Sequence, residues 1–386
     1  MAAAAFPTRA SVVVVGGGVI GLSAAYHLAV SGVRDVVLVE KDELGSGSTC
    51  KAAGGVRAQF SDVVNIELGQ RSLRTFERFA EEFGQDIDLR QVGYLFLLDR
   101  AEHVARFEKN VALQNELGVP SRMLDVAEAK RLSPLIDTDG LLAAAHSPTD
   151  GHCTPESVVL GYATAARRAG ARLLRRTTVE GIEHDGRTIS AVRTDRGSIR
   201  TDTLVCAAGP WSAAVGEMAG VELPVTPLRR QILTTEPIEG LDPHTPFTID
   251  FATSLYFHGE GRGLLLGMSD PDETPGFKLR RDDAWLPRLG AAIERRAPRL
   301  SDVGIAGGWA GLYENTPDHN ALIGEAEEIG RFLYATGFSG HGFLMGPAVG
   351  EVIRDLYHGH RPVVDVSGLD VRRFHVSGAR PELNIV

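Results

Sequence analysis

The sequence predicts an α/β fold of two domains: a Rossmann-like domain that carries a β-meander, and a second, α+β domain built on an antiparallel sheet. Apolar strands run into glycines at three places far apart in the chain, "VVVVGGG", "LVCAAG" and "FLYATG". Ligands collect at the carboxyl ends of parallel strands, so a sheet assembled from these pieces would form one site. The second domain is predicted from a strand-rich stretch, about 225–313, which is punctuated by Pro and Gly and lacks a βα rhythm.

Length and composition are those of an ordinary globular protein with two domains. The 386 residues are 43% hydrophobic and 23% charged. The net charge of −10 argues against binding to nucleic acid or anionic lipid, and no apolar stretch is long enough to span a bilayer. Three cysteines lie far apart, without the spacing of a zinc site or a disulfide framework. We therefore expect a cytoplasmic protein without a metal site.

The N-terminal segment reads as a strand, a glycine turn and a helix, "SVVVVGGGVIGLSAAYHLAVSG", followed by a second buried strand, "DVVLVE". Arg9 before an apolar run imitates a signal peptide, but the glycines and the second strand favour a buried strand. Apolar residues at helical spacing predict a helix over 62–83 that ends at Gly84. A strand over 94–98 and a helix over 101–118 follow.

A new unit begins at Thr154, a suitable helix N-cap that is followed by Pro155. Asp-Gly and Arg-Gly turns after this helix indicate the β-meander. The strand before "GFSGHGF" leads into a helix that we expect to begin near Gly346. We assign the Rossmann-like domain to 1–85, 151–225 and 316–386, and the second domain to 86–150 and 226–315.

The first glycine turn carries the strongest local motif. Gly16 to Gly21 satisfy G-x-G-x-x-G between a strand and a helix, and Glu40 ends the next strand. Gly16 permits the tight turn, Gly18 lets a pyrophosphate approach the backbone, and Gly21 lets the helix lie close to the sheet. Glu40 can bind a ribose diol and would repel a 2′-phosphate. The motif predicts a dinucleotide other than NADP and leaves NAD and FAD open; a glycine turn without a ligand is the alternative.

Motifs over nearly the whole chain resemble the D-amino-acid-oxidase-type superfamily of FAD enzymes. They are "VVVVGGGVIGLSAAYHLA", "VVLVEKDELGSGST", "AGGVR", "LVCAAGPWS" and "ATGFSGHGF…GPAVGEVI", and the sarcosine oxidase-like branch is the most similar, including dimethylglycine and proline dehydrogenase β-subunits. The resemblance implies a Rossmann-like FAD-binding domain and a substrate domain. It also implies FAD contacts from Gly16, Gly18, Val19, Ile20, Gly21, Glu40, Lys41, Ser48, Thr49, Lys51, Gly54, Val179, Ala208, Gly209, Trp211, Gly337, Gly340, His341, Gly342 and Phe343.

In this resemblance, "GFSGHGF" borders the flavin ring, because glycine lets the main chain lie beside a planar group. The positive end of the following helix would stabilise the negative charge of reduced flavin. His341 is either part of this site or a histidine that satisfies a loop carbonyl. The chain has no cysteine near Gly311, where related monomeric oxidases tether FAD, so we expect noncovalent FAD. It also lacks the histidine motif that holds a second flavin, FMN, and we read Cys50 as a bystander.

For the substrate, the resemblance implies a small amino acid whose carboxylate needs a cation. Arg57 is our candidate, with a surface or phosphate-facing arginine as the alternative. Tyr256 and His258 are weaker candidates, which an exposed strand edge would equally explain. Lysines that the family uses for oxygen and for the carboxylate are replaced by Leu265 and Leu344. Because Leu265 replaces the lysine for oxygen, we expect electrons to leave mainly to a partner protein or quinone-like acceptor, with O₂ as a slow route.

The sequence thus predicts an FAD-dependent oxidoreductase that acts on the C–N bond of a secondary or N-methylated amino acid such as sarcosine, dimethylglycine or proline. Glycine, a D-amino acid or a biosynthetic imino acid are alternative substrates. The chain could instead be a β-subunit that is active only within a heteromeric complex, or a flavin-binding protein without turnover. The sequence leaves homo- or hetero-oligomeric assembly open.

Overall fold

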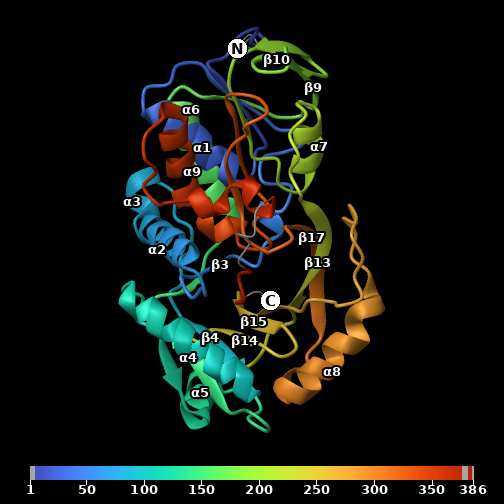
Figure 1. Cartoon of the computed structure of the whole chain (residues 1–386). Coiled ribbons are helices and arrows are strands. Elements are labelled where there is room, and N and C mark those ends of the chain that lie inside the picture. The colour runs from blue at the N-terminus through green and yellow to red at the C-terminus, as the bar shows by residue number, and fades with distance from the viewer. Residues whose placement is uncertain (1–4, 376–380, 385–386) are drawn as a thin grey trace.

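A six-stranded sheet forms the first layer of the structure, a computed structural model that describes residues 5–375 and 381–384 (Figure 1). Its strand order is β18-β19-β12-β1-β2-β8, parallel except for the edge strand β18. The three glycine-ended strands are consecutive neighbours in this sheet, as the sequence predicts. The strands are β1 (Val12–Val15), β2 (Val36–Val39), β8 (Arg172–Leu174), β12 (Leu204–Cys206), β18 (Leu322–Glu325) and β19 (Phe332–Thr336).

The sheet is covered on both faces, because alternate residues of its strands belong to different cores. Val12 and Val14 face a core shared with helices, whereas Val13 and Val15 face a core shared with the β-meander. The helices are α1 (Val19–Val30), α2 (Val63–Glu77), α3 (Phe79–Phe83), α6 (Pro155–Arg168) and α9 (Gly342–His358). The meander consists of β9 (Val179–His184), β10 (Ile189–Thr194) and β11 (Gly197–Arg200), beside α7 (Ser212–Glu217). Both the parallel sheet and the meander are therefore confirmed.

Helices α1 and α9 come from opposite ends of the chain and pack closely against each other. A Cβ at Gly346 would lie 2.5 Å from the Val19 side chain, and one at Gly350 would overlap Ser23. Glycine at these two positions therefore lets the helices approach. This contact holds the N-termini of both helices at the same edge of the sheet.

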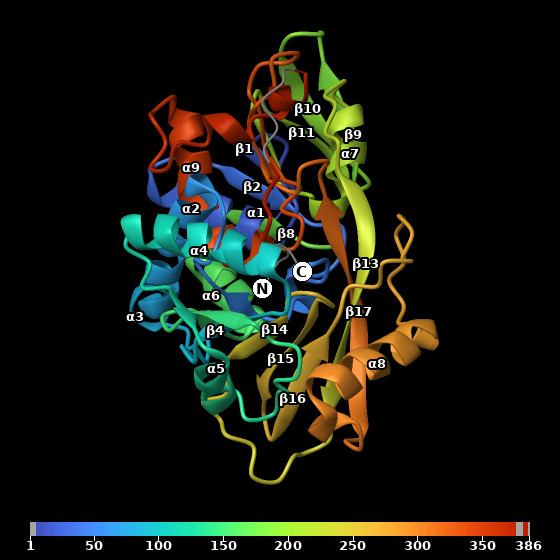
Figure 2. The same ribbon diagram turned by 60° about the horizontal axis from the view of Figure 1, so that its bottom comes forward.

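An eight-stranded sheet forms the second layer, in the order β17-β13-β16-β15-β14-β4-β6-β5. All of its pairings are antiparallel except that of β14 with β4. Figure 2 shows that the long strands β13 and β17 rise from this sheet toward the first layer. The strands are β4 (Tyr94–Leu98), β5 (Arg122–Leu124), β6 (Ala143–Ser147), β13 (Thr226–Thr235), β14 (Phe247–Asp250), β15 (Leu255–Glu260), β16 (Gly263–Gly267) and β17 (Ile305–Asn315).

Three helices pack beside this second sheet, α4 (Ala101–Glu116), α5 (Val126–Leu132) and α8 (Leu286–Arg296). A buried ion pair joins α8 to β14, with 3.2 Å between Arg296 Nε and Asp250 Oδ1. A separate two-stranded sheet pairs β3 (Gly55–Val56) with β7 (Gly151–His152). In the sequence, each of these strands lies between a strand of one large sheet and a strand of the other. Each large sheet draws its strands from one of the two sets of segments that we assigned to the domains, and the boundaries themselves stay a prediction.

Two helices differ from the sequence prediction. The helix predicted over 62–83 is interrupted at Arg78, which caps both α2 and α3, and it ends at Gly84 with φ of 70° as expected. Helix α9 begins at Gly342 rather than near Gly346, and Pro347 lies inside it. The glycine segment "GFSGHGF" therefore runs directly into the first turn of α9. Within the described residues, no helix combines the length and the apolar character that crossing a membrane requires.

Candidate active site

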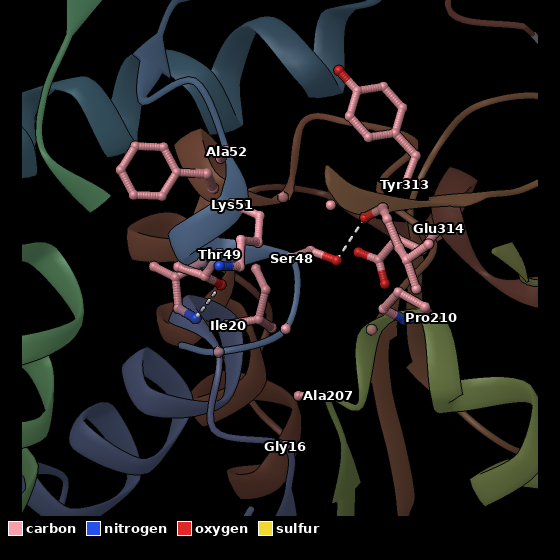
Figure 3. A pocket seen from close by; sticks show the side chains of 18 of the residues that line it. Gly16, Ile20, Ser48, Thr49, Lys51, Ala52, Ala207, Pro210, Tyr313 and Glu314 are labelled. Carbon is pink, nitrogen blue, oxygen red and sulfur yellow. Dashed lines mark hydrogen bonds between the residues drawn. The ribbon is translucent and has the colours of Figure 1, made fainter. Parts of the chain in front are cut away.

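One elongated cavity of about 360 Å³ extends from the carboxyl ends of the parallel strands to the face of the second sheet. We call the part lined by Val15–Ile20 and Val39–Asp42 the dinucleotide end. We call the part lined by Arg57, Tyr94, Arg230, Phe247, Tyr256 and Tyr313 the aromatic end. Figure 3 shows Ser48 and Thr49 on one wall and Tyr313 and Glu314 on the opposite wall.

The glycine turn at the dinucleotide end has the geometry that a phosphate cradle needs. Gly16 has φ of 113°, and a Cβ there would overlap the carbonyl oxygen of Ala207, which directly follows the neighbouring strand β12. A Cβ at Gly21 would overlap the carbonyl oxygen of Gly16. The turn therefore cannot take larger residues, and it places the N-terminus of α1 against the cavity. This backbone fits the pyrophosphate of a dinucleotide.

Glu40 and Lys41 lie at the same end. Glu40 accepts hydrogen bonds from the backbone N–H groups of Gly17, at 2.7 Å, and Asp42, at 2.8 Å. A carboxylate has further lone pairs, so it can also accept from a ribose diol. The Lys41 ammonium lies 4.3 Å from the ring centroid of Trp211, which itself stacks on Phe277. These contacts fix both side chains at the cavity wall.

The segment after β2 crosses the middle of the cavity. The Ser48 hydroxyl donates to the carbonyl of Leu312 at 2.6 Å, and the Thr49 hydroxyl accepts from the N–H of Val19 at 3.1 Å (Figure 3). Gly311 leaves room for the Lys51 side chain, because a Cβ there would lie 2.7 Å from the Lys51 Cβ. The segment thus connects the start of α1 to strand β17.

Most of the cofactor-contact residues predicted from the sequence line this cavity. Those that do are Gly16, Gly18, Val19, Ile20, Glu40, Lys41, Ser48, Thr49, Lys51, Gly54, Val179, Ala208, Gly209, Trp211, Gly340, His341, Gly342 and Phe343. Gly21 and Gly337 are not part of the lining and act through the backbone geometry around it. A Cβ at Gly337, where φ is 70°, would lie 2.5 Å from the Thr316 side chain.

His341 lies at the junction of the glycine segment and α9. Its ring packs edge-on against Phe60 with centroids 5.1 Å apart, and burial holds its pKa well below the usual value. The ring is therefore neutral at physiological pH. Gly340 has φ of 101°, and a Cβ there would lie 2.5 Å from the Tyr313 ring. The glycines thus let the backbone lie directly beside an aromatic wall.

Glu314 is a cavity residue that the sequence analysis missed. Its carboxyl accepts from the Thr336 hydroxyl at 3.2 Å and from the Phe338 N–H at 3.3 Å, so it ties β17 to the segment after β19. Burial raises its pKa to about 7. No local motif marks this residue, because its partners lie more than twenty positions away.

Arg57 brings a buried cation to the aromatic end. Its Nη2 donates to the carbonyl of Asn384 at 2.8 Å, its Nη1 donates to the carbonyl of Gln59, and its guanidinium lies 4.1 Å from the Phe60 ring centroid. Within the described ranges, 5–375 and 381–384, no carboxylate lies within ion-pair distance of Arg57. Its charge therefore remains available to an anionic ligand.

Arg230 is a second cation at the aromatic end, and sequence reasoning missed it. Its guanidinium lies 4.9 Å from the Tyr313 ring centroid, and among the described residues its buried Nε has no hydrogen-bond partner. The residue sits in β13, in "PLRRQI", where one of two adjacent arginines faces inward. Side chains alternate between the two faces of a strand, so the sequence could have singled out Arg230 only if the inner face of the sheet had been known.

Aromatic rings from three strands line the rest of this end. Tyr94 and Phe247 stack with centroids 4.3 Å apart, and Phe247 stacks on Tyr256 at 5.6 Å. Burial raises the pKa of both tyrosines, so their hydroxyls stay protonated. These rings come from β4, β14 and β15, and together they form an apolar wall that excludes water.

His258 lies outside the cavity lining, unlike its neighbour Tyr256. Its ring nitrogens contact the carbonyl oxygens of Gly259 and Ala53, each at 2.9 Å, and burial lowers its pKa to about 4. It also packs against His152, with ring centroids 4.1 Å apart. This geometry favours a role in holding the Ala53 backbone, which does line the cavity, over direct contact with substrate.

The three remaining positions singled out in the sequence are apolar or inert. Leu344 lines the cavity, whereas Leu265 is buried in β16 opposite His258. Cys50 is a free thiol outside the lining, and burial raises its pKa to about 12. A thiol that stays protonated is a poor nucleophile, as expected for a bystander.

Known proteins of similar sequence and structure share this architecture. Residues 11–356 match the family model "FAD dependent oxidoreductase" (DAO). The chain is 34% identical to human mitochondrial sarcosine dehydrogenase and 32% identical to rat mitochondrial dimethylglycine dehydrogenase. These matches cover 96% and 95% of the chain, but only 42% and 45% of the relatives. The chain thus spans less than half the length of these curated relatives.

A solved structure matches over its full length. The crystal structure of L-proline dehydrogenase from P. horikoshii superposes with a TM-score of 0.91 at 35% sequence identity, covering 97% of this chain and 100% of that one. The family match, these relatives and the dinucleotide cradle agree on an FAD enzyme. The chain belongs to the DAO family of FAD-dependent oxidoreductases.

Proposed function

We propose that the chain oxidises the C–N bond of a small secondary or N-methylated amino acid, similar to sarcosine, dimethylglycine or proline. The observation that carries this proposal is the cavity itself, which joins a dinucleotide cradle to an aromatic pocket containing the unpaired Arg57 guanidinium. The names of the related enzymes support the same class of substrate.

The proposed reaction uses few side chains as chemical groups. Bound FAD supplies the two-electron acceptor for the hydride that leaves the carbon next to the substrate nitrogen. The nitrogen lone pair then forms the C=N bond, so the amine must enter neutral. Arg57 would bind the substrate carboxylate, and the Tyr94–Phe247–Tyr256 wall would hold the reacting carbon and exclude water. Burial keeps His341 neutral, so its ring adds no further positive charge to a pocket that receives a neutral amine.

The residues that would hold FAD are those of the dinucleotide end and the glycine segment. The Gly16–Gly18 turn and the N-terminus of α1 would hold the pyrophosphate, and Glu40 the adenosine ribose. Because α9 begins at Gly342, its first turn opens onto the cavity, and its positive end would stabilise an anionic ring system there. With Gly311 at the position of the tethering cysteine, we propose that FAD is held noncovalently.

The route by which electrons leave is proposed from one apolar position. Leu265 stands where related oxidases carry the lysine that activates oxygen, so no ammonium group there would stabilise developing superoxide. We propose a partner protein or quinone-like acceptor, with O₂ as a slow route. Stoichiometric peroxide formation at rates typical of flavin oxidases would contradict this. The same observation favours a second candidate, a subunit that turns over only within a heteromeric complex.

An anaerobic screen tests the proposed function. Purified FAD-loaded protein is mixed with sarcosine, dimethylglycine, proline, glycine and D-amino acids, and the loss of the oxidised-flavin absorbance is followed. We expect bleaching by at least one secondary or N-methylated amino acid. Bleaching only by glycine or D-amino acids would indicate that these, rather than secondary or N-methylated amino acids, are the substrates. Flavin-bound protein that no amine reduces would favour the heteromeric subunit.

A further inference from the structure

The loop from Arg57 to Ser61, which we call the arginine loop, forms hydrogen bonds with residues that are distant in the sequence. The N–H of Ala58 donates to Asp150 Oδ1 at 3.1 Å, and Gln114 Nε2 donates to the carbonyl of Phe60 at 2.7 Å. Asp150 and Gln114 are themselves buried. Such anchoring is more than a surface loop needs, and it indicates that the position of Arg57 is important.

A short segment near the C-terminus, 381–384, supplies the remaining anchors. Glu382 is only 3% exposed, and its carboxylate accepts hydrogen bonds from four donors. They are the N–H of Ser61, the hydroxyl of Ser61, Asn65 Nδ2 and the N–H of Asn384, at 3.1, 2.7, 3.0 and 2.9 Å. No cation pairs with it within the part of the chain that the structure describes. Glu382 therefore anchors this segment through hydrogen bonds alone.

Asn384 connects the segment 381–384 to Arg57 and to the second layer. Its carbonyl oxygen accepts from Arg57 Nη2 at 2.8 Å, and its side-chain oxygen accepts from Asn110 Nδ2, in α4, at 3.0 Å. Asn384 is fully buried. One residue thus joins the guanidinium of the arginine loop to helix α4 of the second layer.

We propose that the segment 381–384 is a positioning element for Arg57, with Glu382 as the residue that holds it in place. This inference rests on the proposed function, in which Arg57 binds the substrate carboxylate. Two guanidinium nitrogens are taken by neutral carbonyls, those of Gln59 and Asn384. Neutral acceptors fix the plane of the guanidinium but leave its charge and its remaining donors for a carboxylate. A carboxylate in place of Asn384 O would instead neutralise the site.

Carboxylate binding to the FAD-loaded protein tests the proposal without turnover. Acetate is titrated, and its dissociation constant is read from the change in the flavin absorption spectrum. We expect Glu382→Ala to weaken acetate binding by about tenfold or more, corresponding to about 1.4 kcal/mol, because the guanidinium loses its fixed plane. The affinity for FAD, measured by fluorescence, should change far less.

Two further variants act as controls. Glu351→Ala removes another acidic tie of α2, a partly buried one to Arg71 at 2.7 Å; its partners Arg71 and Arg354 are not part of the arginine loop, so acetate binding should stay unchanged. Arg57→Met should abolish it. If Glu382→Ala does not yield folded protein, Asn110→Ala removes the second anchor of Asn384 alone, and the same weakening is expected.

The outcomes separate this inference from the proposed function. Wild-type acetate affinity in Glu382→Ala, with loss in Arg57→Met, overturns the positioning role and leaves Arg57 as the clamp. Unchanged affinity in Arg57→Met overturns the clamp itself. In that case a crystal structure of Glu382→Ala decides the inference: a displaced Arg57 guanidinium upholds the positioning role, and an unmoved one overturns it.

Discussion

The two ends of the cavity are built in different ways. The dinucleotide end comes from one continuous strand–turn–helix–strand unit and acts mainly through backbone groups. The aromatic end gathers side chains from β4, β13, β14, β15 and β17 and from the arginine loop, which span more than two hundred positions of sequence. Backbone sites are encoded by local glycine patterns, whereas side-chain sites depend on how distant strands pair.

The largest effect is expected at the backbone end. Gly16→Val should abolish FAD binding, because the new side chain would overlap the carbonyl of Ala207 and would require φ of 113°. Absorbance of purified protein after addition of FAD measures this. Gly32→Ala is the matched control, since Gly32 also has positive φ, 95°, but a Cβ there meets no atom of the described residues within 4 Å. If Gly16→Val bound FAD normally, the cradle would lie elsewhere.

The next largest effect tests the side-chain end alone. Arg57→Met should weaken substrate binding by about two to three orders of magnitude, equivalent to about 3–4 kcal/mol for a buried charge partner, with FAD retained. Anaerobic flavin reduction at increasing substrate concentration measures the apparent dissociation constant. Arg57→Lys keeps the charge but not the planar fork, so it should fall in between. A loss of FAD in Arg57→Met would show that the two ends are not independent.

A pH-dependent effect is expected where the two ends meet. Burial raises the pKa of Glu314 from 4.5 to about 7, so the folded state binds a proton that the unfolded state releases. This contribution to stability is present at low pH and is lost as pH rises from about 4.5 to about 7. Glu314→Gln cannot titrate, so its melting temperature relative to that of the wild type should rise between pH 5 and pH 7.5.

Thermal unfolding of both proteins at constant ionic strength measures this difference. Asp150→Asn is a useful comparison, because burial raises the pKa of Asp150 to about 7 as well. Buried histidines with lowered pKa values make stability rise with pH, the opposite trend. Both proteins contain these histidines, so their contribution cancels when the variant is compared with the wild type. A difference that stays constant with pH would show that Glu314 is ionised in the folded protein.

The smallest effect is expected at the outer edge of the dinucleotide end. Phe277, half exposed, stacks on Trp211 with ring centroids 5.3 Å apart, and Trp211 lines the cavity. Phe277→Ala should weaken FAD binding by about two- to tenfold, as expected for one aromatic pair of about 0.5–1.5 kcal/mol. Fluorescence titration with FAD measures it. Val363→Ala, another exposed apolar side chain outside the cavity lining, should have no effect.

Several predictions from the sequence correspond to local physical requirements. The turn at Gly16 and the C-cap at Gly84 need positive φ, which glycine supplies, and both occur where predicted. The strands of the β-meander are joined by turns at Gly186 and Gly197, which also have positive φ. Helix α9 begins at Gly342, four residues before the predicted start near Gly346, so Pro347 lies inside the helix.

By itself, the sequence determined the α/β class, the dinucleotide cradle and the membership of an FAD family, since each depends on glycines and apolar runs that constrain the backbone over short distances. Only the tertiary structure decided that Glu314, Arg230 and the segment 381–384 lie at the cavity or the arginine loop, and that His258 does not line the cavity. Their positions depend on strand pairing and on hydrogen bonds across hundreds of residues. No local pattern encodes such contacts, because the free energy that fixes them is gained only when both layers are in place.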